Sequence, residues 1–135
     1  MPYVVGIVLS VSVAAFARFV GLDRDRAFYP TVLIVVASYY VLFAAIGQSV
    51  HTVFLECVPM AVFVIAAVAG FKSNAWIVVA GLAGHGVFDA FHGYLLENPG
   101  MPAWWPAWCL AYDVGAAVCL GWLLQRRPGD VKTRP

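Results

Sequence analysis

Five apolar runs, each long enough to cross a bilayer as a helix, account for most of this 135-residue chain. The hydrocarbon core of a bilayer is about 30 Å thick, and a helix of about 20 apolar residues spans it. Short polar stretches or proline- and glycine-containing stretches separate the runs. The sequence therefore predicts an all-α polytopic membrane protein, a bundle of five transmembrane helices. The predicted spans are residues 3–20, 30–47, 52–70, 75–96 and 106–124.

The composition supports a single membrane domain. Hydrophobic residues make up 63% of the chain and charged residues only 11%, whereas soluble domains carry about 25% charged residues. We expect one transmembrane domain over residues 1–124 and a polar cytoplasmic tail over residues 125–135. The net charge of +1 identifies no partner. We expect contact with membrane lipids and none with nucleic acid, and the sequence leaves the formation of a homo-oligomer open.

The basic residues predict how the chain is oriented in the membrane. In a five-span arrangement all eight fall on one side: Arg18, Arg24, Arg26, Lys72, Arg126, Arg127, Lys132 and Arg134. Because basic loops stay in the cytoplasm, the amino terminus is predicted outside and the carboxyl terminus inside, in a bacterial inner membrane. A secretory signal would carry positive charge before its apolar run. The first run has none there, which favours a retained span.

A polar stripe runs along the fourth predicted span. His85, Asp89 and His92 are spaced so that they share one face of a helix. Small residues, among them Gly81 and Gly86, flank them and would let a neighbouring helix approach closely. Ionisable side chains at membrane depth are costly, so such a stripe indicates a functional site with partners on other helices.

The other acidic residues within the spans lie at matching depths. In the predicted topology Glu56 falls about one turn below the outer surface, His51 at its rim, and Asp113 ~10 Å deep. All of these lie in the outer half of the membrane, as do Asp89 and His92. Because the topology was set by lysine and arginine alone, this convergence independently predicts a single outer-leaflet site.

Imidazole and carboxylate groups are the usual ligands of zinc and of non-haem iron or manganese. The sequence therefore predicts a divalent metal site, with zinc favoured and iron or manganese as alternatives. The predicted ligands are His85, Asp89, His92, Glu56 and Asp113, with His51 as a further candidate. A metal with an open coordination position activates water. We expect hydrolysis of a lipid or lipid-soluble substrate, with Asp89, Glu56 and Asp113 as the catalytic residues.

Other interpretations of the same residues remain open. They could form a metal-free polar network that joins helices, or a site for a small ligand or a proton. The protein could also bind a metal without catalysis, or be a structural subunit of a larger membrane complex. Haem is disfavoured because His85 and His92 share a face of one helix. The cytoplasmic halves of the spans contain no acidic residue and no histidine, so we expect a blind pocket rather than a transport path.

Cysteine and aromatic residues carry weaker predictions. Cys57 and Cys109 fall on the predicted outer side, where a disulfide could form, although buried free thiols are the favoured state. Packing with a satisfied hydroxyl is favoured for Tyr39 and Tyr40 over a role in the polar cluster. The tryptophans that follow Pro102 are typical of an aromatic belt at the bilayer surface.

Three stretches carry a resemblance to known proteins: residues 28–31 (FYPT), 85–93 (HGVFDAFHG) and 105–113 (WPAWCLAYD). Together they resemble an uncharacterised family of small bacterial multi-span membrane proteins. That resemblance implies a multi-span fold and no particular activity. The chain is also similar to membrane hydrolases and hydroxylases that hold metals with helix-borne histidine and aspartate. It lacks their His-x-x-His-His box, which argues against a hydroxylase or a desaturase.

Overall fold

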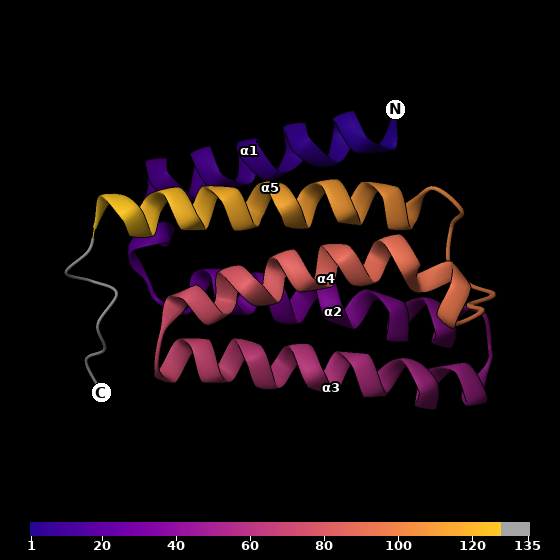
Figure 1. The fold of residues 1–135 in the computed structure, drawn as a ribbon. Helices are drawn as coiled ribbons and strands as arrows, with labels where there is room; N and C mark the ends of the chain where they lie inside the picture. Colours follow the sequence, from indigo (N-terminus) through magenta and orange to yellow (C-terminus); the bar gives the residue numbers. More distant parts are fainter. Residues whose placement is uncertain (128–135) are drawn as a thin grey trace.

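Five long helices and one short one form the part of the chain that the computed structural model describes, residues 1–127 (Figure 1). The helices are α1 (Pro2–Val20), α2 (Phe28–Ile46), α3 (Val50–Lys72), α4 (Ala75–Leu95) and α5 (Trp105–Arg126), with a 3-10 helix, η1 (Leu22–Arg24), between α1 and α2. All five long helices are apolar enough to cross a membrane. There is no strand in residues 1–127, and the predicted all-α five-helix bundle is confirmed.

The helix ends follow local signals in the sequence. Each helix begins and ends within two residues of its predicted span. The Asn74 side chain accepts a hydrogen bond of 3.0 Å from the Trp76 amide and so caps α4. Ser49 caps α3 in the same way. α5 continues through Arg126, so the first two residues assigned to the tail are helical, whereas Lys132 and Arg134 lie outside the described residues.

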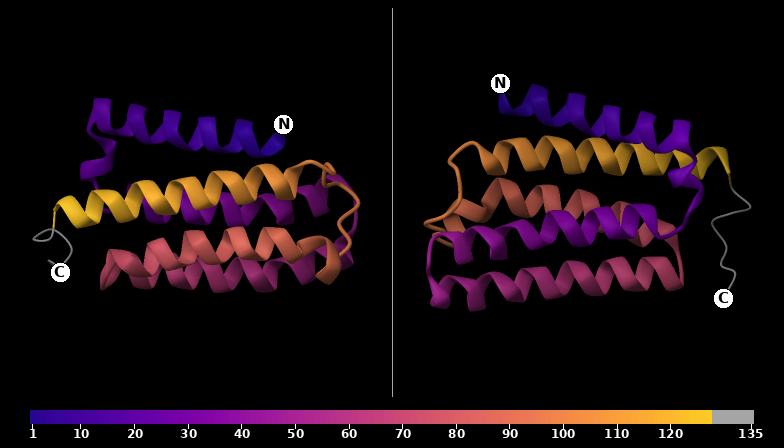
Figure 2. Two further views of the ribbon diagram at one scale, coloured as in Figure 1. Left: turned by 45° about the horizontal axis from the view of Figure 1, so that its top comes forward. Right: turned by 180° about the vertical axis from the view of Figure 1, so that it is seen from behind.

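Helix α4 lies between α3 and α5, while α2 packs mainly against α3 and α1 packs against α5 (Figures 1 and 2). The predicted close approaches occur at two of the small residues of α4. A Cβ added to Gly81 would lie 2.6 Å from Leu33, and one added to Gly86 would lie 3.3 Å from Val114. Gly93 faces open space. Gly81 and Gly86 thus let α2 and α5 reach the polar face of α4.

The outer surface of the bundle is apolar. Large side chains such as Phe19, Phe54 and Ile65 are exposed, each by more than 60%. A water-soluble protein of this size does not expose apolar side chains on this scale. Together with the five apolar helices, this surface is that of a multi-pass membrane protein.

Two glycines hold the connection between α4 and α5 against the end of α2. A Cβ added to Gly47 would lie 2.6 Å from the amide nitrogen of Gly100, and one added to Gly100 would collide with the carbonyl of Phe43. Only glycine allows this close approach of two backbones. As a result, residue 98 in the same connection is brought over the ends of α2 and α3, beside the polar face of α4.

Candidate functional site

The polar face of α4 is fully enclosed by its neighbours. His85, Asp89 and His92 are each exposed by 1% or less, and so are Glu56 of α3 and Asp113 of α5. Each side chain points inward because positions three, four and seven residues apart lie on one face of α4, and this face meets α3, α2 and α5. The five side chains do not form one shell, however; they divide into two groups.

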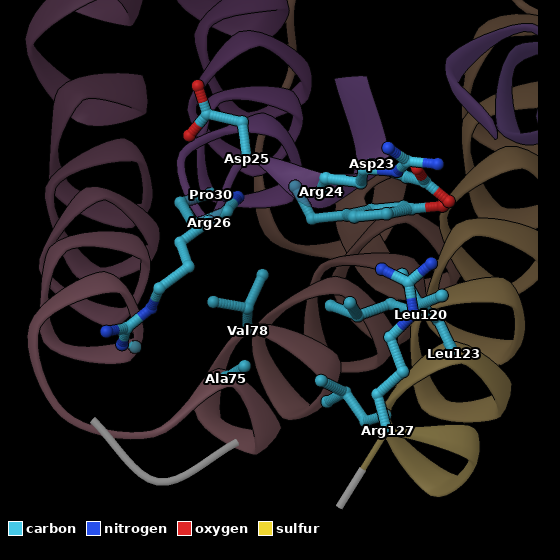
Figure 3. A pocket seen from close by; sticks show the side chains of 13 residues that line it. Asp23, Arg24, Asp25, Arg26, Pro30, Ala75, Val78, Leu120, Leu123 and Arg127 are labelled. Carbon is cyan, nitrogen blue, oxygen red and sulfur yellow. The ribbon is translucent and has the colours of Figure 1, made fainter. Parts of the chain in front are cut away.

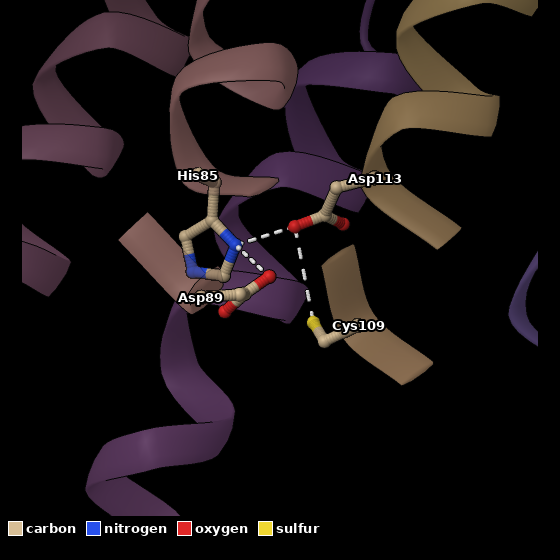
Figure 4. A group of neighbouring side chains, drawn as sticks. All are labelled: His85, Asp89, Cys109 and Asp113. Atoms are coloured by element: carbon tan, nitrogen blue, oxygen red, sulfur yellow. Dashed lines mark hydrogen bonds and ion pairs between the residues drawn. The ribbon is translucent and has the colours of Figure 1, made fainter. Parts of the chain in front are cut away.

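The first group joins α4 to α5 (Figure 4). His85 Nδ1 lies 2.5 Å from Asp113 Oδ2 and 3.5 Å from Asp89 Oδ2, so that one imidazole faces two carboxylates. The thiol of Cys109, one turn before Asp113 on α5, lies 3.8 Å from Asp113 Oδ2. One ligand atom from each of these four residues lies within 4.8 Å of the others. We call these four residues the inner cluster.

The second group joins α4 to α3 and to the connection before α5. His92 Nε2 donates a hydrogen bond of 2.6 Å to Glu56 Oε1. Asn98 donates to the same oxygen at 3.1 Å and to the backbone carbonyl of Tyr40 at 2.8 Å. We call Glu56, His92 and Asn98 the outer cluster. It has two groups suited to a metal, where the inner cluster has four.

Tyr40 of α2 connects the two clusters. Its hydroxyl donates a hydrogen bond of 2.5 Å to Asp89 Oδ1 of the inner cluster. Its ring is stacked on His92 of the outer cluster, with a centroid distance of 3.9 Å and an interplanar angle of 9°. One side chain therefore orients a carboxylate of one cluster and an imidazole of the other.

Several buried polar atoms of both clusters have no hydrogen-bond partner within residues 1–127. They are Asp89 Oδ2, Asp113 Oδ1, Glu56 Oε2 and His92 Nδ1. A buried polar atom without a partner costs about 1–3 kcal/mol, and more where the group is charged. Each carboxylate thus keeps one oxygen available for a cation, a proton or water, which is typical of a binding site and unusual in a packed core.

The structure leaves the sixth predicted ligand outside both clusters. His51 is exposed, whereas its neighbour Thr52 is buried on the same face of α3 as Glu56. The physical reason is the helical period: Thr52 precedes Glu56 by four residues and shares its face, and His51 is rotated away by one further residue. His51 instead lines a hollow at the end of the bundle where α2 leads into α3; we call it the outer hollow because it lies on the side predicted to face outward.

Three residues of the site were not predicted as members of it. Cys109 precedes Asp113 by four residues, so helical spacing could have placed it beside that carboxylate. Tyr40 was expected to serve packing, yet its hydroxyl meets Asp89. Asn98 lies in the proline- and glycine-rich connection, where nothing in the sequence indicates a contact with Glu56.

The cysteines do not form disulfides. Cys57, Cys109 and Cys119 are free; Cys57 is exposed and Cys109 is buried in the inner cluster. The two cysteines considered for a disulfide thus have different surroundings, and Cys109 is the one placed to act as a ligand.

Comparison with protein-family models, with curated proteins and with solved structures finds no match to this chain. The resemblance carried by residues 28–31, 85–93 and 105–113 therefore brings no functional assignment. What can be concluded is coarser: a multi-pass membrane protein with a buried cluster of histidine, aspartate and cysteine. Any function has to be argued from the chemistry of the two clusters.

Proposed function

We propose that this membrane protein binds one divalent metal ion, with zinc favoured, through His85, Asp89, Cys109 and Asp113. The observation that carries the proposal is the convergence of four donor atoms within 4.8 Å of one another, all of them buried. Tetrahedral zinc takes nitrogen, sulfur and oxygen ligands at about 2.0–2.3 Å, which sets neighbouring donors roughly 3.3–3.7 Å apart. Small side-chain rotations bring the inner cluster to that spacing.

The charges of the inner cluster support a cation. Two carboxylates and a thiol surround a single imidazole in a site without water contact. A divalent ion would neutralise these groups and bind to Asp89 Oδ2 and Asp113 Oδ1, which have no hydrogen-bond partner in the described chain. Iron and manganese bind the same oxygen and nitrogen donors, but the thiol of Cys109 favours zinc over manganese.

Binding without turnover is the function that the geometry supports best. Four protein donors complete a tetrahedral shell, as in structural zinc sites, whereas catalytic sites keep one position open. The inner cluster joins α4 to α5, so a bound ion would fix these helices together. Metal binding would then be a condition of the folded bundle.

The test is the metal content of purified protein, measured by elemental analysis, and the spectrum of its cobalt-substituted form. We expect about one ion per chain and a thiolate-to-cobalt charge-transfer band in the near ultraviolet. Cys109→Ser should abolish that band, and Asp113→Asn should lower the metal content. The matched control is Glu56→Gln, which alters the outer cluster and should keep both the charge-transfer band and the metal content. Folded wild-type protein that binds none of these metals would leave the hydrogen-bonded network as the better interpretation.

One observation favours a second function, metal-dependent hydrolysis of a lipid or lipid-soluble substrate. The outer cluster holds an acid–imidazole pair with Glu56 Oε2 and His92 Nδ1 unpartnered, and Asn98 links this pair to the outer hollow that it helps to line. In that case Asp89 and Asp113 would hold a metal that keeps one coordination position open for water, in place of a full shell of four protein donors, and Glu56 would receive the proton of that water.

The two functions are distinguished by turnover of quenched fluorescent phospholipid esters. If the protein is a hydrolase, the wild type should hydrolyse these esters. Glu56→Gln should abolish this activity and leave the metal content unchanged. Absence of turnover in metal-loaded protein would leave binding alone.

A further inference from the structure

A second hollow lies at the opposite end of the bundle, between η1, the start of α2, the start of α4 and the end of α5 (Figure 3). Its volume is about 580 Å³. Apolar side chains form its floor, among them Val78 of α4 with Leu120 and Leu123 of α5. The described basic residues gather at this end, where α1, α3 and α5 finish.

Two arginines line this hollow without a side-chain partner. The guanidinium groups of Arg24 and Arg127 make no hydrogen bond, ion pair or ring contact with any residue of the described 1–127. Two acidic residues, Asp23 and Asp25, line the same hollow. Asp23 pairs with Arg18 at 3.3 Å, and Asp25 accepts a hydrogen bond of 2.9 Å from the amide of Ala27.

A third donor lines the same hollow. Tyr29 is only 7% exposed, and its hydroxyl has no hydrogen-bond partner within the described part of the chain. By contrast, Arg26 donates a hydrogen bond of 2.8 Å to the carbonyl of Phe71 and so ties the start of α2 to the end of α3. The hollow therefore combines two uncommitted cations and a hydroxyl with an apolar floor.

We propose that this hollow binds one anionic phospholipid, with its phosphate between Arg24 and Arg127 and part of an acyl chain on the floor. The planar guanidinium group matches the oxygens of a phosphate in two parallel hydrogen bonds. Basic pockets between the ends of transmembrane helices suit the head groups of anionic lipids, which lie at that depth. The proposal does not depend on metal binding by the inner cluster.

The experiment places the full-length protein in nanodiscs of phosphatidylcholine with a minor fraction of phosphatidylglycerol. The lipids retained after mild detergent exchange are then counted by native mass spectrometry. We expect one phosphatidylglycerol retained in preference to phosphatidylcholine. Each basic contact near a membrane surface is worth ~1 kcal/mol, or about fivefold in affinity. Arg24→Gln and Arg127→Gln should each weaken retention about fivefold, and the double variant about 25-fold.

Arg126→Gln is the matched control, because Arg126 neighbours Arg127 but lies over the Trp122 ring at 4.3 Å and does not line the hollow. It should leave retention unchanged. Equal retention of both lipids, or an equal loss in Arg126→Gln, would overturn the proposal in favour of general surface charge. Glycerol phosphate serves as a soluble competitor. If it displaces the lipid at the lipid's own concentration, the site recognises a free phosphate and the lipid assignment is wrong.

Discussion

The two histidines of α4 are seven residues apart, share one helix face and each meet a carboxylate, yet their surroundings differ. His85 has Asp113 of α5 at 2.5 Å, with a second carboxylate and a thiol close by. His92 has Glu56 of α3 at 2.6 Å and an amide, Asn98, beyond it. The chemistry of the pair is the same, and the neighbours decide what each pair can do.

The difference concerns both donor number and access. The inner cluster supplies four metal-binding groups, none of which lines either hollow. The outer cluster supplies two such groups and is connected through Asn98 to the outer hollow. A donor-rich cluster away from both hollows suits a permanently bound ion, whereas a buried pair that Asn98 connects to a hollow suits exchange of protons or water. The comparison yields four predictions, from the largest expected effect to the smallest.

Removing Asp113, the carboxylate closest to His85 in the inner cluster, should cause the largest loss of stability. Asp113→Ala removes the closer of the two carboxylates that face His85, whose side chain is 1% exposed, and breaking such a buried pair costs ~3–5 kcal/mol in the free energy of unfolding. Denaturant unfolding in micelles, followed by circular dichroism, measures this. Replacing His85 and Asp113 together by leucine should recover much of the lost stability. A single variant as stable as the wild type would show that the pair does not hold α4 to α5.

Removing the acid of the outer cluster should cost less. Glu56→Ala deprives His92 of its partner, but the space that the substitution opens lies beside Asn98, which lines the outer hollow, so we expect water to enter it. We expect a loss of ~1.5–3 kcal/mol, the range for a hydrogen bond to a charged group. The same unfolding assay applies. A loss as large as that of Asp113→Ala would contradict the distinction between a cluster away from both hollows and one connected to a hollow through Asn98.

Tyr40→Phe tests whether the two clusters are coupled. The variant keeps the ring on His92 and removes the hydroxyl from Asp89, so we expect a loss of ~1–2 kcal/mol. A double-mutant cycle of Asp113→Asn and Glu56→Gln should show coupling of ~0.5–3 kcal/mol in the wild type. In the Tyr40→Phe background the losses in the free energy of unfolding caused by Asp113→Asn and by Glu56→Gln should be additive to within ~0.5 kcal/mol. Unchanged coupling there would mean that Tyr40 is not the link.

Asn98→Ala should have the smallest effect. It removes one side-chain amide from Glu56 and from the Tyr40 carbonyl, for a loss of ~1 kcal/mol. Hydrogen exchange should rise in residues 96–104, while the metal content stays the same. Glu97→Gln, an exposed neighbour, is the control and should lie within ~0.5 kcal/mol of the wild type. Loss of metal in Asn98→Ala would show that the inner cluster depends on this connection.

The fold followed from the sequence because bilayer thickness and helical rise fix the length of each span. The stripe of His85, Asp89 and His92 could also be predicted from the sequence, since the 3.6-residue period determines which residues share a helix face. Depth in the membrane then identified Glu56 and Asp113 as residues at matching heights. In the structure their side chains do meet the two histidines.

The division of the site residues into two clusters could not be predicted from the sequence. Which carboxylate faces which histidine depends on the rotation of α3 and α5 about their own axes, and depth alone carries no information on rotation. Asn98 depends further on the path of the α4–α5 connection, which the close approach of Gly47 and Gly100 determines. Such contacts between residues distant in sequence have no local signal.

The packing of α1 has a consequence for how this protein is made. Among the described helices, α1 packs only against α5 and the adjoining η1. Gly6 lies so close to Ala111 that a Cβ on it would be 2.9 Å away, so the two helices pack closely at this point. Because α1 precedes α5 in the chain, it is synthesised before the one long helix that it packs against. A translation product that stops after α4 would contain four inserted helices, one of them without a neighbour to bind and available to quality-control proteases.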